Sequence, residues 1–580
     1  MIIRYFFITL FVILFQNVFS QINPPKIYLQ NKTLDYYNLI TEYTKLADAS
    51  DKAKLITYGN TDSGKPLHLL VISESKEFNP EILRKQNKRI ILINNGIHPG
   101  EPAGIEASLQ LAAELLNGKP ISSVLKNSVV CIIPIYNIGG MLNRSAYNRA
   151  NQNGPEECGF RGNARNIDLN RDYMVCQTAN ARSITQIFHE WLPDVFLETH
   201  TTDGSDHQQT LTIITTAHQD LPPELGEFLD KKMQPELYKM MRQTSKYKIC
   251  PYVTVWRDTP DNGYSLFLES PRYSTGYVSL FNTLSFMTEN HIFKPFEDRV
   301  LSCLDFMHCL LEFTSDNSNE IAEKRKKADE YLNKQKEFVL TWKIDSLKFD
   351  YITFEGYEAS YPPCKLTGEP LLHYDRNKPY TKQIKYYNHY DPDITVEAPK
   401  YYILPQAWHE AVERLKLNNI EMTRLNSDTT ITLEMYYIKS YDTYDSPYNG
   451  HYPHYNIKLE SKVMSVNFYK GDYVIPVKGI NKYYLIQALE PNAPDSFFSW
   501  NLFDEILQSR EYFSPFIFEE RAMQILDTTP GLKKQLRIAI AESPDMEKNT
   551  YLQMKFIYRH SPYFEKTYMR YPVGRVNGEL

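Results

Sequence analysis

The stretch from Arg89 to Gly118 constrains the fold more than any other, because strand, tight loop and helix signals follow one another there. Residues 89–95 form an apolar, β-branched run typical of a buried parallel strand. A short glycine-bracketed loop follows, Pro102 suits the first turn of a helix, and the helical periodicity of residues 104–116 stops at Gly118. This order predicts a βα unit of an α/β protein, with a polar loop at the carboxyl end of its strand, where open α/β sheets place their sites.

The loop of this unit carries His98 and Glu101, and a second apolar strand ends later at His200. A His, a Glu three residues on and a distant second His supply three zinc ligands and leave a fourth position open, which distinguishes a catalytic zinc from a structural one. The His-x-x-Glu pattern alone is weak, because 14 histidines in this chain give on the order of one chance match. The positions of both segments at strand ends favour a zinc site over a surface histidine beside a capping glutamate.

Four short motifs occur in an order that resembles the zinc carboxypeptidase family, the carboxypeptidase A-like peptidases, over roughly residues 50–310. The motifs are His98-Pro-Gly-Glu101, Asp168-Leu-Asn170-Arg171, Glu198-Thr-His200 and Met287-Thr-Glu289. The resemblance implies one zinc per chain, held by His98, Glu101 and His200. It also implies that Glu289 is the general base.

The segment from Arg161 to Arg171 resembles the family's run from oxyanion arginine to substrate clamp, in the spacing of its shorter bacterial members. The resemblance implies that Arg161 stabilises the oxyanion, with Arg165 as a competing candidate. It further implies that Asn170 and Arg171 bind a free C-terminal carboxylate of the substrate. The alternative for the last two residues is a salt bridge on a surface loop.

Two further positions complete the expected site. By the same resemblance, Asp168 orients a zinc-ligating histidine through that residue's second ring nitrogen. The family also uses a mobile tyrosine over the substrate, for which Tyr277 is the choice here, with Tyr264 and Tyr273 left open in the same loop. We expect His207 to be a solvated loop histidine rather than a ligand.

The chemistry of peptide hydrolysis requires these residue types independently of any family. Zinc lowers the pKa of a bound water to about 7 and polarises the scissile carbonyl. A carboxylate takes the water proton, fixed positive charge stabilises the oxyanion, and a planar guanidinium binds a carboxylate through two hydrogen bonds. We therefore expect a zinc metallocarboxypeptidase that cleaves the C-terminal peptide bond through a zinc-bound water. The alternatives are a zinc amidase or peptidase acting on cell-wall peptides and, less favoured because no ligand is missing, a catalytically silent binding protein.

Composition and the N-terminus restrict partners and location. The 580 residues carry a net charge of -6 with both signs mixed, which argues against a nucleic-acid partner. Arg4 precedes a short apolar run, and small residues stand before Gln21, so residues 1–20 are expected to be a signal peptide. We expect an exported protein, periplasmic or extracellular, with no integral membrane segment after signal removal.

The 7 cysteines are sparse and odd in number, so we expect no disulfide framework. Cys158 and Cys176 bracket the segment from Arg161 to Arg171. A bridge between them would brace the clamp loop, and we keep it as a hypothesis.

The domain expectation is a catalytic domain at residues 21–314, a helical linker at 315–345 and an α+β accessory region of unknown role at 346–580. For the catalytic domain the expected fold class is α/β, with a mixed, mostly parallel twisted sheet flanked by helices. In the accessory region short alternating runs indicate strands at 352–357 and 482–487. Helices are expected at residues 405–416, 497–507 and 532–541. Clustered tyrosines there indicate half-exposed β-strands at least as well as a binding face for sugars or peptides.

Overall fold

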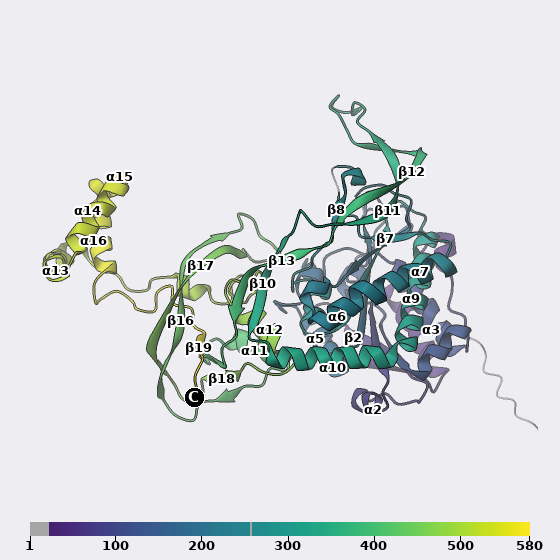
Figure 1. Ribbon diagram of the computed structural model, residues 1–580, viewed down its shortest axis with the longest axis horizontal. Coiled ribbons are helices and arrows are strands. Elements are labelled where there is room, and N and C mark those ends of the chain that lie inside the picture. The colour runs from purple at the N-terminus through teal and green to yellow at the C-terminus, as the bar shows by residue number, and fades with distance from the viewer. Residues whose placement is uncertain (1–21, 203, 256–257, 580) are drawn as a thin grey trace, which may run out of the picture.

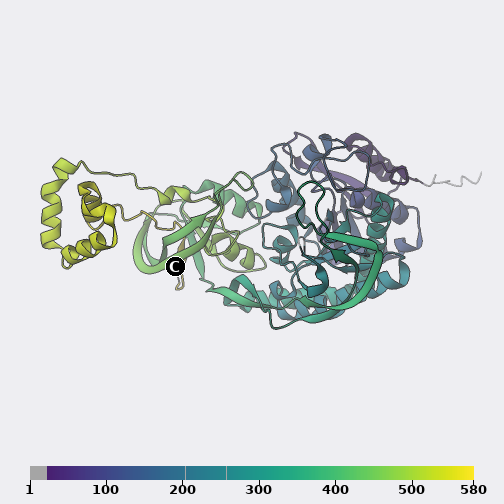
Figure 2. The same ribbon diagram turned by 90° about the horizontal axis from the view of Figure 1, so that it is seen from above.

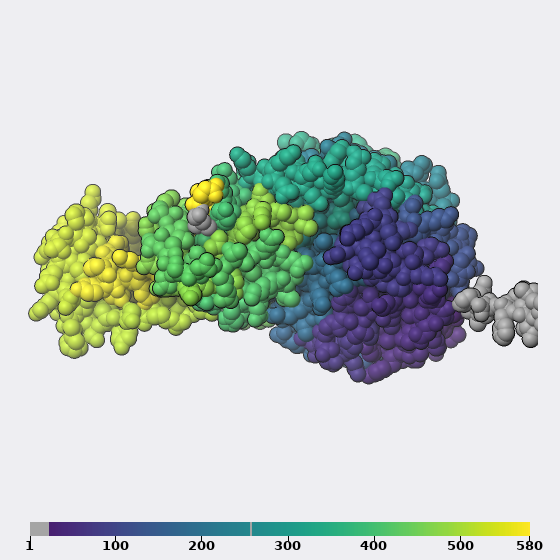
Figure 3. Space-filling model, turned by 90° about the horizontal axis from the view of Figure 1, so that it is seen from below, coloured from purple at the N-terminus to yellow at the C-terminus, as the bar shows by residue number. Residues whose placement is uncertain are grey.

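The computed structural model describes residues 22–202, 204–255 and 258–579. A large α/β lobe is followed by an elongated second part that ends in a small helical lobe, as Figures 1 and 2 show. In the space-filling view of Figure 3, this helical lobe protrudes at the end of the molecule opposite the purple N-terminal residues. The expected signal peptide at residues 1–20 lies outside the described residues.

An eight-stranded mixed sheet forms the centre of the large lobe, which confirms the predicted fold class. In spatial order its strands are β1 (Ala53–Asn60), β2 (Pro66–Ile72), β4 (Ser128–Ile133), β3 (Arg89–Asn94), β5 (Val195–Thr202), β9 (Leu284–His291), β6 (Leu211–Thr215) and β7 (Ile249–Pro251). The four central strands β4, β3, β5 and β9 are parallel to one another. The outer strands β2 and β6 are antiparallel to the central strands beside them.

Helices cover both faces of the sheet, because its buried strands present apolar side chains on either side. Ile91 and Ile93 of β3 belong to the core of one face, whereas Ile90 and Leu92 belong to the core of the other. The first face packs on α1 (Tyr36–Asp48), α3 (Ala103–Leu116), α6 (Pro223–Phe228), α7 (Gln234–Thr244), α9 (Phe296–Asp316) and α10 (Ser318–Lys334). The second face packs on α2 (Pro80–Lys85), α5 (Ala179–Trp191), α8 (Ser274–Ser279), α11 (His409–Leu417) and α12 (Lys482–Leu489).

The βα unit predicted around His98 is present as β3, a loop and α3. Gly96 turns the chain after the strand with a φ of 68°, a conformation that favours glycine. Gly104 lets α3 approach β5 closely, since an added Cβ there would lie 2.1 Å from Oγ1 of Thr199. Because the loop with His98 and Glu101 directly precedes α3, this close packing brings the first two candidate ligands near β5, which carries His200.

The second half of the chain shares a core with the large lobe. One buried cluster runs from Phe188 and Phe281 in the large lobe to Leu415 and Tyr484 in the accessory region. The aromatic rings of Phe281 and Tyr484 stack with centroids 5.7 Å apart. Part of the accessory region, which was expected to begin at residue 346, thus packs into the core of the α/β lobe.

The accessory strands form three further sheets. They are β10 (Glu337–Ile344) with β13 (Tyr390–Glu397); β8 (Tyr264–Ser265) with β11 (Asp350–Ser360) and β12 (His373–Tyr387); and a six-stranded sheet of β14 (Tyr401–Leu404), β15 (Thr423–Arg424), β16 (Thr429–Thr443), β17 (His454–Phe468), β18 (Tyr473–Pro476) and β19 (Gly574–Val576). Because β12 pairs with β8, the β11–β12 hairpin lies on the large lobe, as Figure 1 shows. Residues 315–345, the expected helical linker, contain the end of α9, all of α10 and then β10.

The helical lobe consists of α13 (Pro515–Thr528), α14 (Leu532–Glu542), α15 (Pro544–Glu547) and α16 (Thr550–Arg559), around a small core of its own. The predictions for residues 352–357, 405–416 and 532–541 are confirmed by β11, α11 and α14. The helix predicted at 497–507 is wrong, because these residues form turns that end in the short 3₁₀ helix Asp504–Leu507. The strand predicted at 482–487 is wrong, because these residues form α12. That helix is buried on all sides, so its sequence lacks the one-sided helical period that distinguishes it from a strand.

Within the described part of the chain, no helix is long and apolar enough to cross a membrane. All 7 cysteines are free thiols, so the proposed bridge between Cys158 and Cys176 is wrong. Cys176 points into the core, with its Sγ atom 3.7 Å from Oγ1 of Thr185. Cys158 instead pairs its backbone with Ser145 at the other end of the loop.

Candidate metal centre and substrate cavity

His98, Glu101 and His200 meet at the carboxyl ends of β3 and β5, and their potential ligand atoms lie within 4.8 Å of one another. All three side chains are buried. Nδ1 of His200 is 3.0 Å from Oε2 of Glu101, and Nδ1 of His98 is 3.2 Å from Oε1 of the same carboxylate. The structure thus brings the three predicted ligands together around one point.

Each histidine of this cluster is held from behind by a second carboxylate. Nε2 of His98 lies 3.0 Å from Oδ1 of Asp168, and Nε2 of His200 lies 3.2 Å from Oε2 of Glu198. A metal-ligating histidine characteristically uses its second ring nitrogen in this way, which fixes the ring and its tautomer. Both Nδ1 atoms therefore face the common point.

Glu198 belongs to the motif Glu198-Thr-His200, but no role was predicted for it from the sequence. Glu198 and His200 are two residues apart on β5, so their side chains leave the strand on the same face. Tyr173 also donates to Glu198, at 2.9 Å, as does the hydroxyl of Ser274. Burial opposes ionisation of Glu198, but its hydrogen bond to His200 lowers its pKa.

Glu289 stands next to His200 because β5 and β9 are parallel and these two residues are paired in register. Its Oε2 atom is buried and accepts no hydrogen bond in the described structure. Burial raises the pKa of Glu289 to about 8, and the nearby carboxylates of Glu101 and Glu269 add to the rise. A cation beside Glu289 would favour its ionised form.

Two arginines lie beside the carboxylates of the cluster. Arg161 contacts Asp168 through Nε at 3.0 Å and Nη2 at 2.8 Å, and its Nη1 atom is 3.7 Å from Glu101. Arg149 reaches the same Glu101 at 2.5 Å. Arg149 was not predicted as a site residue, because it lies 48 positions from Glu101 and outside the four motifs. Arg165, the competing candidate for the oxyanion role, is exposed and does not line the cavity.

Asn170 and Arg171 follow Asp168 on a single helical turn, Leu169–Arg171. Asn170 is buried, whereas Arg171 is half-buried. The Arg171 guanidinium stacks on the ring of Tyr273, 4.1 Å from its centroid, and donates to the Asn170 carbonyl at 2.7 Å. This arrangement holds a planar cation at the cavity wall, as the predicted clamp requires.

The prediction that Tyr277 contacts the substrate is wrong. Tyr277 lies within α8 and is 1% exposed, and its hydroxyl bonds to Asn418 in the core of the second face. Of the alternatives left open, Tyr273 lines the cavity and Tyr264 does not. The expectation for His207 is also wrong in part, because this histidine is buried and stacks on His291, outside the metal cluster.

A cavity of about 250 Å³ opens over the cluster. One wall is polar and consists of the candidate ligands, Glu289 and the arginines. The apolar part of the lining comes from Ile214, Tyr252, Phe267 and Met287. Glu269 also lines the cavity, and burial raises the pKa of its carboxyl to about 7.

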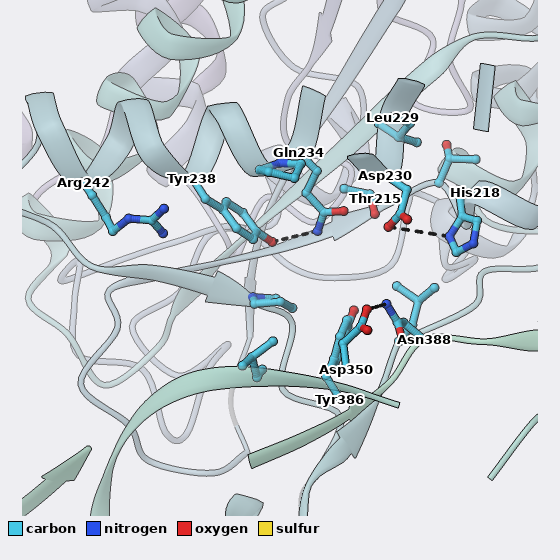
Figure 4. Close-up of a pocket in the computed structure, with 15 residues that line it drawn as sticks. Thr215, His218, Leu229, Asp230, Gln234, Tyr238, Arg242, Asp350, Tyr386 and Asn388 are labelled. Carbon is cyan, nitrogen blue, oxygen red and sulfur yellow. Dashed lines mark hydrogen bonds and ion pairs between the residues drawn. The ribbon is translucent and has the colours of Figure 1, made fainter. Parts of the chain in front are cut away.

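A second cavity, of about 270 Å³, lies on the far side of β6 and β7 from this cluster. Figure 4 shows that Gln234, Tyr238 and Arg242 of α7 line one side of this cavity, and that Tyr386 faces them from a strand on the other side. Two acidic side chains of this cavity have protein partners. Asp350 accepts a hydrogen bond from Asn388 at 2.8 Å, and Asp230 lies 3.9 Å from His218. It contains none of the candidate ligands.

Residues 40–255 match the family model described as zinc carboxypeptidase. These residues belong to the zinc carboxypeptidase family. The family predicted from the motifs is therefore confirmed, and the chain is a zinc metallopeptidase of the carboxypeptidase type. The matched segment includes His98, Glu101 and His200 of the buried cluster.

Carboxypeptidase 2 of Trichophyton rubrum is 21% identical over 458 residues, covering 75% of this chain and 77% of the relative. Carboxypeptidase 2 of Trichophyton equinum is 20% identical over 461 residues, covering 76% and 79%. Both alignments are longer than the matched family segment and reach into the second half of this chain. The solved metallo-carboxypeptidase of Burkholderia cenocepacia is 16% identical, with a TM-score of 0.36, and covers 48% of this chain and 69% of its own.

Proposed function

We propose that this zinc carboxypeptidase is exported and removes C-terminal residues from peptides that end in a free carboxylate. The observation that carries the proposal is one cavity shared by three kinds of group. A potential metal site of His98, Glu101 and His200 forms its floor, Glu289 stands beside it, and Arg171 lies on its wall. A metal, a base and a cation for the substrate carboxylate are the groups that the reaction requires.

The residues of the cluster fit a zinc ion. Nδ1 of His98 is buried and makes no hydrogen bond in the described structure, while Nε2 of the same ring is held by Asp168. Two imidazoles and a carboxylate are a common catalytic zinc set and leave a position open. Although burial works in the opposite direction, His98 and Arg149 hold the pKa of Glu101 well below its usual range, so it is an ionised ligand. The zinc, one per chain, would polarise the scissile carbonyl and lower the pKa of a water.

The remaining steps belong to side chains of this chain. Glu289 accepts the proton of the attacking water and returns it to the leaving amine. Arg161 stabilises the negative charge that develops on the carbonyl oxygen, with Arg149 as a second cation beside it. Arg171 binds the substrate carboxylate, supported by the amide of Asn170. Tyr273 keeps the Arg171 guanidinium flat against the cavity wall.

A second candidate substrate is a cell-wall peptide with a free carboxylate, since the same clamp would bind it. Nine residues separate Arg161 from Arg171. This short spacing supports a cell-wall substrate, because the resemblance assigns it to the shorter bacterial members of the family. A catalytically silent binding protein is the weakest alternative, because the sequence lacks none of the residues expected to bind the metal, act as the base and bind the substrate carboxylate. Export rests on the sequence of residues 1–20 and leaves periplasmic and extracellular locations equally supported.

The test begins with metal content and substrate class. Metal analysis of the purified protein should give about one zinc per chain, and a chelator should abolish the cleavage of both free-acid peptides and muropeptides. Release of single C-terminal residues from peptides supports the first substrate class, and faster cleavage of muropeptides supports the second. A fully active protein after exhaustive chelation would contradict the proposal.

A further inference from the structure

The turn between β16 and β17 of the accessory region reaches the candidate site. In this turn Tyr448 and His451 exchange both backbone hydrogen bonds, at 2.8 Å and 3.0 Å. The two residues between them, Asn449 and Gly450, have φ values of 53° and 81°. Positive φ at both positions is the type I′ geometry of a two-residue hairpin, for which Asn-Gly is a preferred sequence.

The Asn449 side chain leaves this turn toward the large lobe and binds the backbone of Asp168. Its Oδ1 atom accepts from the Asp168 N–H at 2.9 Å, and its Nδ2 atom donates to the Asp168 carbonyl at 2.9 Å. Gln177 donates in turn to the Asn449 carbonyl at 3.1 Å. Turn geometry alone requires none of these bonds, because they join residues 281 or 272 positions apart.

Asp168 links this contact to the chemistry. Its Oδ1 atom holds Nε2 of His98 at 3.0 Å, and its Oδ2 atom holds Nη2 of Arg161 at 2.8 Å. A shift of the Asp168 backbone therefore moves the partner of a zinc-ligating histidine and the partner of the oxyanion arginine together. The next two residues are Asn170 and Arg171, so the clamp depends on the same segment.

We propose that Asn449 is a positioning residue for the metal site, through which the accessory region fixes the segment from Asp168 to Arg171. The inference rests on the proposed function for its catalytic consequences. A second contact of the same region acts in the same direction. The Asp495 carboxylate accepts hydrogen bonds from the backbone N–H of Arg272 at 2.9 Å and from its Nε atom at 2.7 Å, next to Tyr273, which stacks on Arg171.

The decisive variant is Asn449→Gly, because glycine supports the left-handed turn but removes both side-chain hydrogen bonds. The matched control is Asn456→Gly in the same hairpin. Asn456 also has a positive φ, of 51°, and its side chain donates only to Asp442 of the neighbouring strand, at 2.7 Å. Asn449→Asp is a third variant, which keeps the acceptor for the Asp168 N–H and loses the donor.

In the full-length protein, Asn449→Gly should weaken zinc affinity, measured by competition with a chelator, by about 10- to 100-fold, as is typical when support behind a ligand is lost. kcat/KM should fall in the same variant, with Asn449→Asp intermediate and Asn456→Gly close to wild type. Hydrogen exchange of the amides in residues 161–172 should quicken in Asn449→Gly only. Equal zinc affinity and equal exchange in Asn449→Gly and Asn456→Gly would overturn the inference.

The exchange measurement separates this inference from the proposed function. If the wild-type protein binds no zinc, the proposed function fails, yet the exchange of residues 161–172 still reports whether Asn449 holds that segment. If Asn449→Gly does not fold, Asn449→Asp decides. Exchange and zinc affinity equal to wild type in Asn449→Asp would then overturn the inference, and a loss of both in the folded variant would support it.

Discussion

Replacing Glu289 by glutamine should separate catalysis from folding and metal binding. Glutamine keeps the shape of the side chain but cannot accept the proton of the attacking water. General base catalysis contributes about 10²–10⁴-fold, so kcat should fall by that factor, or about 3–5 kcal/mol in the barrier. Zinc content should stay near wild type, because Glu289 is not among the three clustered ligands.

The same variant should be more stable than wild type once the metal has been removed. In the protein without its metal, burial raises the pKa of Glu289 from 4.5 to about 8, and its Oε2 atom has no hydrogen-bond partner there. Each pKa unit corresponds to about 1.4 kcal/mol, so ionising this carboxyl costs the folded state on the order of a few kcal/mol. Because the folded pKa is raised, the wild-type chain loses stability as the pH rises from about 5 to 8. Glutamine does not titrate, so the stability advantage of the variant should grow over this pH range.

The assay is kcat on a peptide substrate together with melting temperatures of the chelated proteins at pH 5 and pH 8. The matched control is Glu106→Gln, since Glu106 is also buried with a raised pKa and an unpartnered Oε2, but lies on α3 against Thr33. The control should keep its kcat. Near-normal turnover in Glu289→Gln, or loss of zinc with it, would refute the role of this residue as the base.

Three other substitutions test the remaining parts of the site and its support. Arg171→Ala should slow the cleavage of free-acid peptides by roughly ten- to a hundredfold, because a charged hydrogen-bond partner is worth about 1.5–3 kcal/mol. The ratio of the cleavage rates of free-acid and amidated peptides should therefore fall. An unchanged ratio would argue against the clamp. Glu198→Gln should lower zinc affinity by about 10- to 100-fold in a chelator competition, since the carboxylate behind His200 is lost; wild-type affinity would show that Glu198 only packs. Gly104→Ala should destabilise the fold by about 1–3 kcal/mol in denaturant unfolding, because its Cβ would lie 2.1 Å from Thr199, whereas Gly578→Ala, with open space around it, should be neutral.

The candidate site could be predicted where the information is local in the sequence. His98 and Glu101 are three residues apart after an apolar strand, and His200 lies at the end of a second apolar strand. These local patterns were enough to predict that the three side chains lie at the same edge of the sheet. Glu198 could have been found as well, because alternate residues of a strand share a face. Arg149 carries no such signal, since only the folded loop brings it to Glu101.

Other errors came from tertiary context. The choice among three tyrosines depended on where α8 begins, and its start at Ser274 turns Tyr277 into the core while Tyr273 stays on the cavity wall. The strand predicted at residues 482–487 failed because burial on every side removes the amphipathic period. The core shared by the two halves of the chain could not be predicted from the sequence. An apolar residue indicates burial but does not indicate which lobe its side chain contacts.

If the clamp and the metal act together on a free peptide C-terminus, two matched substrates should be cleaved at different rates. A peptide with a free C-terminal carboxylate and the same peptide with an amidated C-terminus are incubated with zinc-loaded enzyme, and the products are identified by mass spectrometry. We expect release of the single C-terminal residue from the free acid, loss of this activity on chelation, and cleavage of the amide slower by roughly tenfold or more. Equal cleavage of both peptides, or cleavage at internal bonds, would contradict it.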